Sequence, residues 1–244
     1  MVKTEGIFLD LENLKILSCV VRNLWVVQRF LSVALTEAIQ SRAGTESNQL
    51  ARVQSAFDLG AKIYNNADYG DDHTSLGTAL KSNAPISVIA LLLEKGALIR
   101  NPDSCNNPFG TTIGMAIDAK NSTKTIEFLL KRGAEILNQP DNKCDILSQA
   151  VSKKLPPETI KLLLDNGADA TGPFALRQAF GNKNLGITDE VTSNQIIDLL
   201  LHRCESSLIE ENLKFMVEDY QKATPKTSAS EPKVPNNFTK QYEL

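Results

Sequence analysis

The chain has 244 residues, enough for one or two compact domains or for one elongated stack of repeats. Hydrophobic residues make up 42% of the chain and aromatic residues only 6%, which favours an aliphatic core. The formal net charge is -3, and no block of Lys and Arg is present of the kind that displaces counterions from phosphates, so nucleic acid is not an expected partner.

The first predicted element is an apolar helix near the N-terminus. Residues 7–31 carry apolar side chains at helical spacing and are predicted to form the N-terminal cap, within residues 1–33. Residues 16–35 are the most apolar stretch, but they contain Arg22 and Arg29, and a charge at the centre of a bilayer costs several kcal/mol. We expect neither a membrane span nor a secretory signal here, but a buried helix with two polar edges.

A ten-residue motif then recurs along the chain. The run Val-Ile-Ala-Leu-Leu-Leu-Glu-Lys-Gly-Ala at residues 88–97 returns as Thr-Ile-Glu-Phe-Leu-Leu-Lys-Arg-Gly-Ala at 125–134 and as Thr-Ile-Lys-Leu-Leu-Leu-Asp-Asn-Gly-Ala at 159–168. A degenerate earlier copy contains Gly60, and a later copy has Cys204 in place of the glycine. The four glycines are 36, 37 and 34 residues apart, and the cysteine follows 37 residues later, which indicates a repeat protein.

A shorter motif with a shared alanine precedes each of these runs. In the long motif, apolar residues four apart line one face of a helix, and the alanine of the short motif leaves room for close packing. A glycine ends each long helix because it reaches positive φ without a Cβ clash. Each repeat is therefore predicted to be a helix, a turn, a second helix and a connection. The short motif lies at residues 75–80, 112–117, 146–151 and 175–180, with a first copy at 34–39.

These motifs resemble ankyrin repeats, whose period is about 33 residues with a Thr-Pro-Leu-His-x-Ala signature. Residues 74–79 and 111–116 match the signature in Thr, the aliphatic residue and Ala. Asp145 and Phe174 replace the Thr in the last two copies, and the Pro and His are replaced in every copy. The substitutions remove part of a hydrogen-bond network, so we expect a lower stability than that of a consensus array.

The resemblance implies an all-α fold, an ankyrin-type helix-turn-helix solenoid with short hairpin connections and helical caps. The main alternative is another helix-pair solenoid such as tetratricopeptide repeats, which lack the Leu-Leu-Leu-x-x-Gly-Ala ending. The expected organisation is an N-terminal capping helix in 1–33, an array over 34–204, a C-terminal capping helix in 205–222 and a disordered tail over 223–244. The five repeats are expected at about 34–65, 66–101, 102–138, 139–170 and 171–204.

The resemblance further implies that the connections project as hairpin fingers, at 64–73, 100–110, 138–144 and 169–173. A protein partner is then expected to bind the finger tips and the concave face of the inner helices. An aromatic side chain at a finger tip is a strong binding anchor, and the alternative is that Tyr69 and Phe109 pack under their own hairpins. A long loop, expected at 181–194, is a secondary candidate contact. The predicted protein-binding residues are Tyr69, Asp71, Asp72, His73, Asn106, Asn107, Phe109, Asp141, Asn142 and Lys143.

The sequence carries no motif for catalysis or for cofactor binding. It has two histidines, no Gly-rich phosphate loop and no G-x-S-x-G elbow. Asp71, Asp72 and His73 are read as a solvated turn, because no second cluster supplies further metal ligands. The four cysteines form no C-x-x-C pair and favour a reducing, intracellular setting. No cofactor, metal or small-molecule substrate is expected.

We therefore expect a non-catalytic protein–protein interaction module in the cytoplasm, an adaptor or scaffold. The alternative is a structural or regulatory subunit of a larger or homo-oligomeric assembly. Divergent arrays with a polar tail also resemble secreted effectors that bacteria deliver into a host cell.

Overall fold

The computed structural model describes eight stretches of the chain, and within them the fold is all-helical, with eleven helices and no strand. Side chains are described from Val26 onward, apart from Pro173, Glu211 and Asn212. The described stretches are residues 11–42, 44–65, 74–100, 111–136, 138, 145–170, 173–203 and 211–223.

The first unit consists of a long helix and a shorter one. Helix α1 spans Leu11–Gln40, and α2 spans Glu46–Asp58, where the Thr45 side chain accepts a hydrogen bond from the Asn48 N–H at 3.3 Å. The sequence analysis places a cap at 7–31 and a separate helix at 34–39. The structure joins the two in α1, because no Gly or Pro occurs within that helix to end it.

Three central units repeat one pattern, a seven-residue helix followed by a nine-residue helix. Thr74 and Thr111 cap the first helix of their units, and each Oγ1 accepts a backbone N–H at 3.0 Å. Gly96, Gly133 and Gly167 follow the second helices with φ of 97°, 93° and 91°, which confirms the predicted helix ends. The helices are α3 Ser75–Lys81 and α4 Ile86–Glu94, α5 Thr112–Asp118 and α6 Thr123–Lys131, and α7 Ile146–Ser152 and α8 Pro157–Asp165.

Asp145 takes the capping role of threonine in the third of these units. Its carboxylate accepts the Ser148 N–H, so this substitution keeps a capping hydrogen bond, although the sequence analysis expects the replaced Thr to remove part of a hydrogen-bond network. Burial and then the nearby Asp169 carboxylate raise the pKa of Asp145 above its ordinary value of 3.8, although the hydrogen bonds from the α7 N-terminus act in the opposite direction. Asp145 therefore caps α7, but burial makes its charged form less favourable than it would be in water.

Two buried asparagines, one in the turn after α5 and one in the last turn of the first helix of the last unit, bond to the preceding unit. Asn121 is only 3% exposed, and its Nδ2 donates to the carbonyl oxygen of Leu80 in the preceding unit at 2.9 Å. Asn182 donates to the carbonyl oxygen of Val151 at 3.1 Å in the same way. Both carbonyl groups also accept a backbone N–H from the turn after their own helix, so each asparagine adds a second bond to a carbonyl at a helix end.

The last unit differs from the prediction in its connection. Helix α9 spans Pro173–Asn184 and α10 spans Glu190–Arg203. The predicted loop at 181–194 is therefore shortened to residues 185–189, since helix continues on both sides of it. Gly186, at φ 61°, ends α9, and the Ile187 N–H donates to the Asn182 carbonyl at 2.8 Å.

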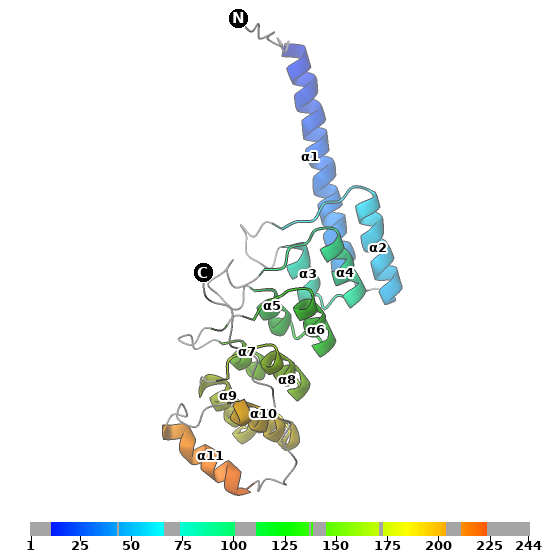
Figure 1. Cartoon of the computed structure of the whole chain (residues 1–244). Coiled ribbons are helices and arrows are strands. Elements are labelled where there is room, and N and C mark those ends of the chain that lie inside the picture. The colour runs from blue at the N-terminus through cyan, green and yellow to red at the C-terminus, as the bar shows by residue number, and fades with distance from the viewer. Residues whose placement is uncertain are drawn as a thin grey trace, which may run out of the picture.

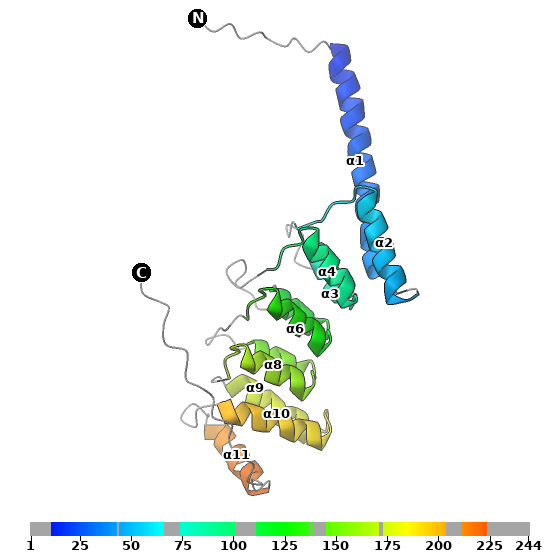
Figure 2. The ribbon, with the colours of Figure 1, turned by 45° about the vertical axis from the view of Figure 1, so that its right-hand side comes forward.

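The units stack in chain order around one continuous core (Figure 1). The first helices of the units, α1, α3, α5, α7 and α9, pack successively on one another. Among the second helices, α2 packs on α4, and α8 packs on both α6 and α10. Figure 2 shows α4, α6, α8 and α10 as one row along the stack. The core is aliphatic as predicted and runs from Leu35 to Tyr220.

Helix α11, Glu211–Ala223, covers the C-terminal end of the stack by packing on α9. Leu213, Val217 and Tyr220 of this helix are buried. The Tyr220 ring meets Phe180 edge-on, with centroids 5.9 Å apart, and its hydroxyl lies 3.1 Å from the Asn194 carbonyl oxygen. A C-terminal helix was predicted at 205–222, of which residues 205–210 lie outside the described residues.

Helix α1 projects beyond the stack at the opposite end (Figures 1 and 2). The prediction of a buried helix over 16–35 is wrong for four apolar side chains, since Val26, Val27, Phe30 and Val33 are 39%, 51%, 71% and 50% exposed, whereas Leu35 is buried. Helix α1 packs on α2 and α3, and these four side chains remain at the surface. Across the described residues, no helix combines the length and apolarity that crossing a bilayer requires.

Candidate functional site

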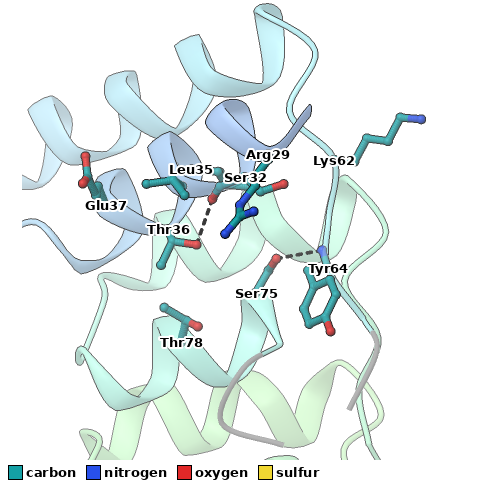
Figure 3. Close-up of a pocket in the computed structure, with 10 residues that line it drawn as sticks. Arg29, Ser32, Leu35, Thr36, Glu37, Lys62, Tyr64, Ser75 and Thr78 are labelled. Carbon is teal, nitrogen blue, oxygen red and sulfur yellow. Dashed lines mark hydrogen bonds between the residues drawn. The ribbon is translucent and has the colours of Figure 1, made fainter. Parts of the chain in front are cut away.

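A groove of about 690 Å³ lies where α1, α3 and the first connection meet (Figure 3). Lys62 and Tyr64 of the connection form one wall, and Ser75 and Thr78 of α3 lie opposite α1. The α1 residues that line the groove are Arg29, Ser32, Val33, Leu35, Thr36 and Glu37.

Reciprocal hydrogen bonds fix the connection to the start of α3. The Tyr64 N–H donates to the Ser75 Oγ at 2.9 Å, and the Ser75 N–H donates to the Tyr64 carbonyl at 2.8 Å. The next unit repeats the arrangement, since the Arg100 N–H donates to the Thr112 Oγ1 at 2.8 Å and the Thr112 N–H donates to the Arg100 carbonyl at 2.9 Å. Each connection therefore leaves the stack at a defined position.

Hydroxyl groups form much of the α1 wall. Ser32 Oγ donates to the Gln28 carbonyl at 2.8 Å, and Thr36 Oγ1 donates to the Ser32 carbonyl at 2.9 Å. Because each proton is directed into the helix, the hydroxyl oxygens retain acceptor capacity on the groove side. Tyr64 is 40% exposed and supplies an aromatic surface beside them.

The charged side chains of the groove are two cations and one carboxylate. Arg29 extends between α1 and α3 into the groove, whereas Lys62 extends outward from the connection (Figure 3). Glu37 lies on the far side of Thr36 from Arg29 (Figure 3). The groove thus combines an aromatic ring, hydroxyl acceptors and a net positive charge.

A smaller groove of about 350 Å³ lies near the other end of the same series of first helices. Phe174, Arg177 and Gln178 of α9 line it together with Ser148 of α7. The Arg177 guanidinium lies 5.8 Å from the centre of the Phe174 ring. Both grooves are therefore built from first helices, α1 and α3 at one end and α7 and α9 at the other.

Two asparagines that the sequence analysis does not single out hold the connections in register. Asn65 Nδ2 donates to the Gly96 carbonyl at 2.8 Å, and its Oδ1 accepts the Leu98 N–H at 3.0 Å. Asn138 makes the same pair of bonds to the Gly167 carbonyl at 2.6 Å and the Asp169 N–H at 2.9 Å. The signal was an Asn five residues after the motif glycine.

The predicted finger-tip residues lie outside the described residues, so their positions relative to the groove are not defined. This applies to all ten: Tyr69, Asp71, Asp72, His73, Asn106, Asn107, Phe109, Asp141, Asn142 and Lys143. The structure does describe the first residues of three predicted fingers, Tyr64, Arg100 and Asn138. In the described part of the chain, no three His, Cys, Asp or Glu side chains come together in a geometry suited to a metal ion.

Comparisons with known proteins do not assign the chain to a family. No protein-family model matches the chain, and a search of the curated proteins returns no match.

Proposed function

We propose that the chain is an ankyrin-type solenoid that binds a protein partner without catalysis, along the face formed by its first helices and at its connections. The observation that carries the proposal is the groove between α1, α3 and Tyr64, which opens where the first connection leaves the stack.

The repeated architecture supports the ankyrin-type assignment. Short first helices and longer second helices alternate through three units, and each unit ends in a glycine at positive φ. Successive units share one core, as expected of a stack in which each helix pair buries its faces against its neighbours. This regularity produces an extended surface, which suits an extended partner segment.

The chemistry of the groove favours a peptide segment with an acidic side chain. Tyr64 offers an aromatic contact of the kind that dominates binding energy in protein interfaces. The hydroxyl oxygens of Ser32 and Thr36 are placed to accept backbone N–H groups, and Lys62 points outward at the rim, where its amine would attract a carboxylate at the edge of a bound segment.

Affinity capture from a cell lysate tests the proposal. The variant Lys62→Glu/Tyr64→Ala is expected to lose proteins that the wild type retains, while its helicity and melting temperature stay close to those of the wild type. Lys124→Glu is the matched control, because it makes the same charge change at an exposed position of α6, away from the groove.

An identical set of captured proteins for wild type and the groove variant would reject the groove as the binding site. Ala substitutions at Tyr69, Asp72 and Phe109 together then separate the fingers from the groove. Loss of partner in that variant alone would assign binding to the finger tips.

A further inference from the structure

The groove between α1, α3 and the first connection carries opposite charges at its two ends. Lys62 and Glu37 both line it, and both side chains are exposed. Within the part of the chain that the structure describes, neither the Lys62 amine nor the Glu37 carboxylate makes a hydrogen bond or an ion pair. Both charges are therefore available to a bound molecule.

A hydrogen bond and helix geometry give the separation of the two charges. Gln28 Nε2 donates to the Gly60 carbonyl at 3.3 Å, which places the start of the first connection, and so Lys62, at the Gln28 end of the α1 wall. Arg29, the next residue along α1, extends into the groove at the same end (Figure 3). Glu37 follows Arg29 by eight residues, so the two ends lie about 12 Å apart along α1 at about 1.5 Å per residue.

We infer that the groove selects an extended peptide segment with an acidic and a basic side chain about four residues apart, the acidic one at the Lys62 end and the basic one at Glu37. An extended chain rises about 3.3 Å per residue, and alternate residues point to the same side, so residues i and i+4 place two charges about 13 Å apart on the groove side. The inference rests on the proposed function, because it specifies the segment of the partner that the groove holds.

The middle of the groove suits the residue between the two charges. In an extended segment, residue i+2 points to the same side as i and i+4. It meets the exposed side chains of Val33 and Tyr64, so an apolar residue is favoured there. The hydroxyl oxygens of Ser32 and Thr36 accept backbone N–H groups of the same segment. The complement of the groove is thus an acidic, an apolar and a basic residue at alternate positions, in either chain direction.

The Glu37 carboxylate belongs to this groove and not to the repeat. It occupies the fourth position of the short motif, where the other four copies carry uncharged residues, Thr78, Met115, Gln149 and Gln178. The smaller groove, which includes Gln178, has a cation but no carboxylate among its described lining residues. Of the two grooves, only the one at α1 therefore presents both signs of charge.

Selection from a phage-displayed library of random peptides, each about twelve residues long, on the immobilised full chain tests the inference. Wild type is expected to select peptides in which an acidic and a basic residue lie about four apart around an apolar one. Glu37→Lys makes the groove cationic at both ends, so it is expected to select an acidic residue at both positions. Glu37→Gln is expected to keep the acidic residue and to lose the preference for a basic one.

Dissociation constants of two synthetic peptides make the comparison quantitative. The first is a peptide selected by wild type, and the second is the same peptide with Glu in place of its basic residue. Wild type is expected to bind the first about tenfold more tightly, and Glu37→Lys the second by about the same factor. A reversal of preference reports the charge at this position, because a variant that failed to fold would bind neither peptide.

Glu218→Lys is the matched control, because it makes the same charge change at an exposed position of α11, at the opposite end of the stack (Figure 1). It is expected to select the same peptides as wild type and to bind the first synthetic peptide with unchanged affinity.

Three results would overturn the inference: no peptide selected by wild type, selected peptides that carry acidic residues alone, or an unchanged selection by Glu37→Lys. Partner binding by the groove is tested separately, by capture with Lys62→Glu/Tyr64→Ala. Loss of lysate proteins from that variant, together with an unchanged peptide selection by Glu37→Lys, would keep the groove as the binding site and reject the charge pair. Retention of the lysate proteins would reject the groove as the partner site and the inference with it.

Discussion

At the scale of single residues, the glycines that end the second helices are required for their backbone conformation. Gly133 has φ of 93°, and a Cβ added there would meet no atom within 4 Å. Space is therefore not the constraint at this position. The constraint is the left-handed backbone, which is unfavourable for a residue with a side chain and most unfavourable for a β-branched one.

Gly133→Val is expected to lower the free energy of unfolding by about 1–2 kcal/mol, measured by urea denaturation. Gly181→Ala serves as the comparison, because Gly181 lies within α9 without positive φ and is equally uncrowded. That substitution is expected to raise stability by up to about 1 kcal/mol through helix propensity. A neutral Gly133→Val variant would contradict the helix end described above.

Asp145 leads to a prediction about pH. Because its pKa is raised in the folded chain, the folded state binds the proton more tightly than the unfolded state does. Its contribution to stability therefore improves as pH falls through the folded pKa towards 3.8, and it is least favourable at neutral pH. A carboxylate in an ion pair has the opposite pH dependence, because its pKa is lowered and its contribution to stability is lost as pH falls.

Asp145→Asn keeps a capping oxygen and removes the titration. The variant is expected to be more stable than wild type at neutral pH, and the difference is expected to shrink as the pH falls to about 4. Thermal unfolding of both proteins across this pH range measures the difference. A difference that stays constant with pH would show that the carboxyl group has an ordinary pKa.

At the scale of helices, asparagines connect one unit to the next along both edges of the stack. Asn121 does so from a buried position, where its Nδ2 serves the carbonyls of Leu80 and Ala116. Asn138 does so from an exposed position on the connection side. The buried asparagine should contribute more to stability. When either side chain is removed, water can replace its hydrogen bonds only at the exposed position.

Asn121→Ala is expected to cost about 2 kcal/mol of unfolding free energy, and Asn138→Ala about 1 kcal/mol. Gln195→Ala, at an exposed position of α10, is the control for a change of a polar side chain to alanine. Chemical denaturation of the three variants gives the comparison. Equal costs for the two asparagines would show that burial does not control their contribution.

The helices themselves were largely predictable, and their exact extents were less so. Gly96, Gly133 and Gly167 end their helices because the backbone there needs positive φ. This need depends only on neighbouring residues, so a single sequence motif is enough to predict it. The continuity of α1 was also visible in principle, since Leu11–Gln40 lacks a helix breaker. The cap prediction divided the helix because a family pattern, not the local sequence, set its boundary.

The candidate groove was much harder to predict. It combines α1, α3 and Tyr64, and the meeting of these elements depends on how far each unit turns relative to the last. Asn65 and Asn138 were missed for a related reason. A lone polar residue after a glycine reads as a solvated turn until the backbone of the next unit is brought within hydrogen-bond distance.

At the scale of the whole molecule, contacts between adjacent units dominate, and this predicts local responses to damage. Tyr220 joins α11 to the last unit through its ring and its hydroxyl. Tyr220→Ala is expected to cost about 3 kcal/mol, by analogy with large-to-small substitutions in a core. Hydrogen exchange is expected to accelerate in α9, α10 and α11 and to stay unchanged in α3 and α4. A uniform acceleration along the chain would show that the stack unfolds as one unit.

The asparagine links also have a mechanical consequence. Asn65, Asn121, Asn138 and Asn182 each join one unit to its neighbour, so a chain pulled from its two ends would resist at these joints and yield between them. A unit of 34 to 37 residues that gives way releases roughly 120 Å of extended chain, many times its thickness within the stack. Stretched in this way, the molecule would lengthen in discrete steps and would act as an extensible tether between whatever is attached to its two ends.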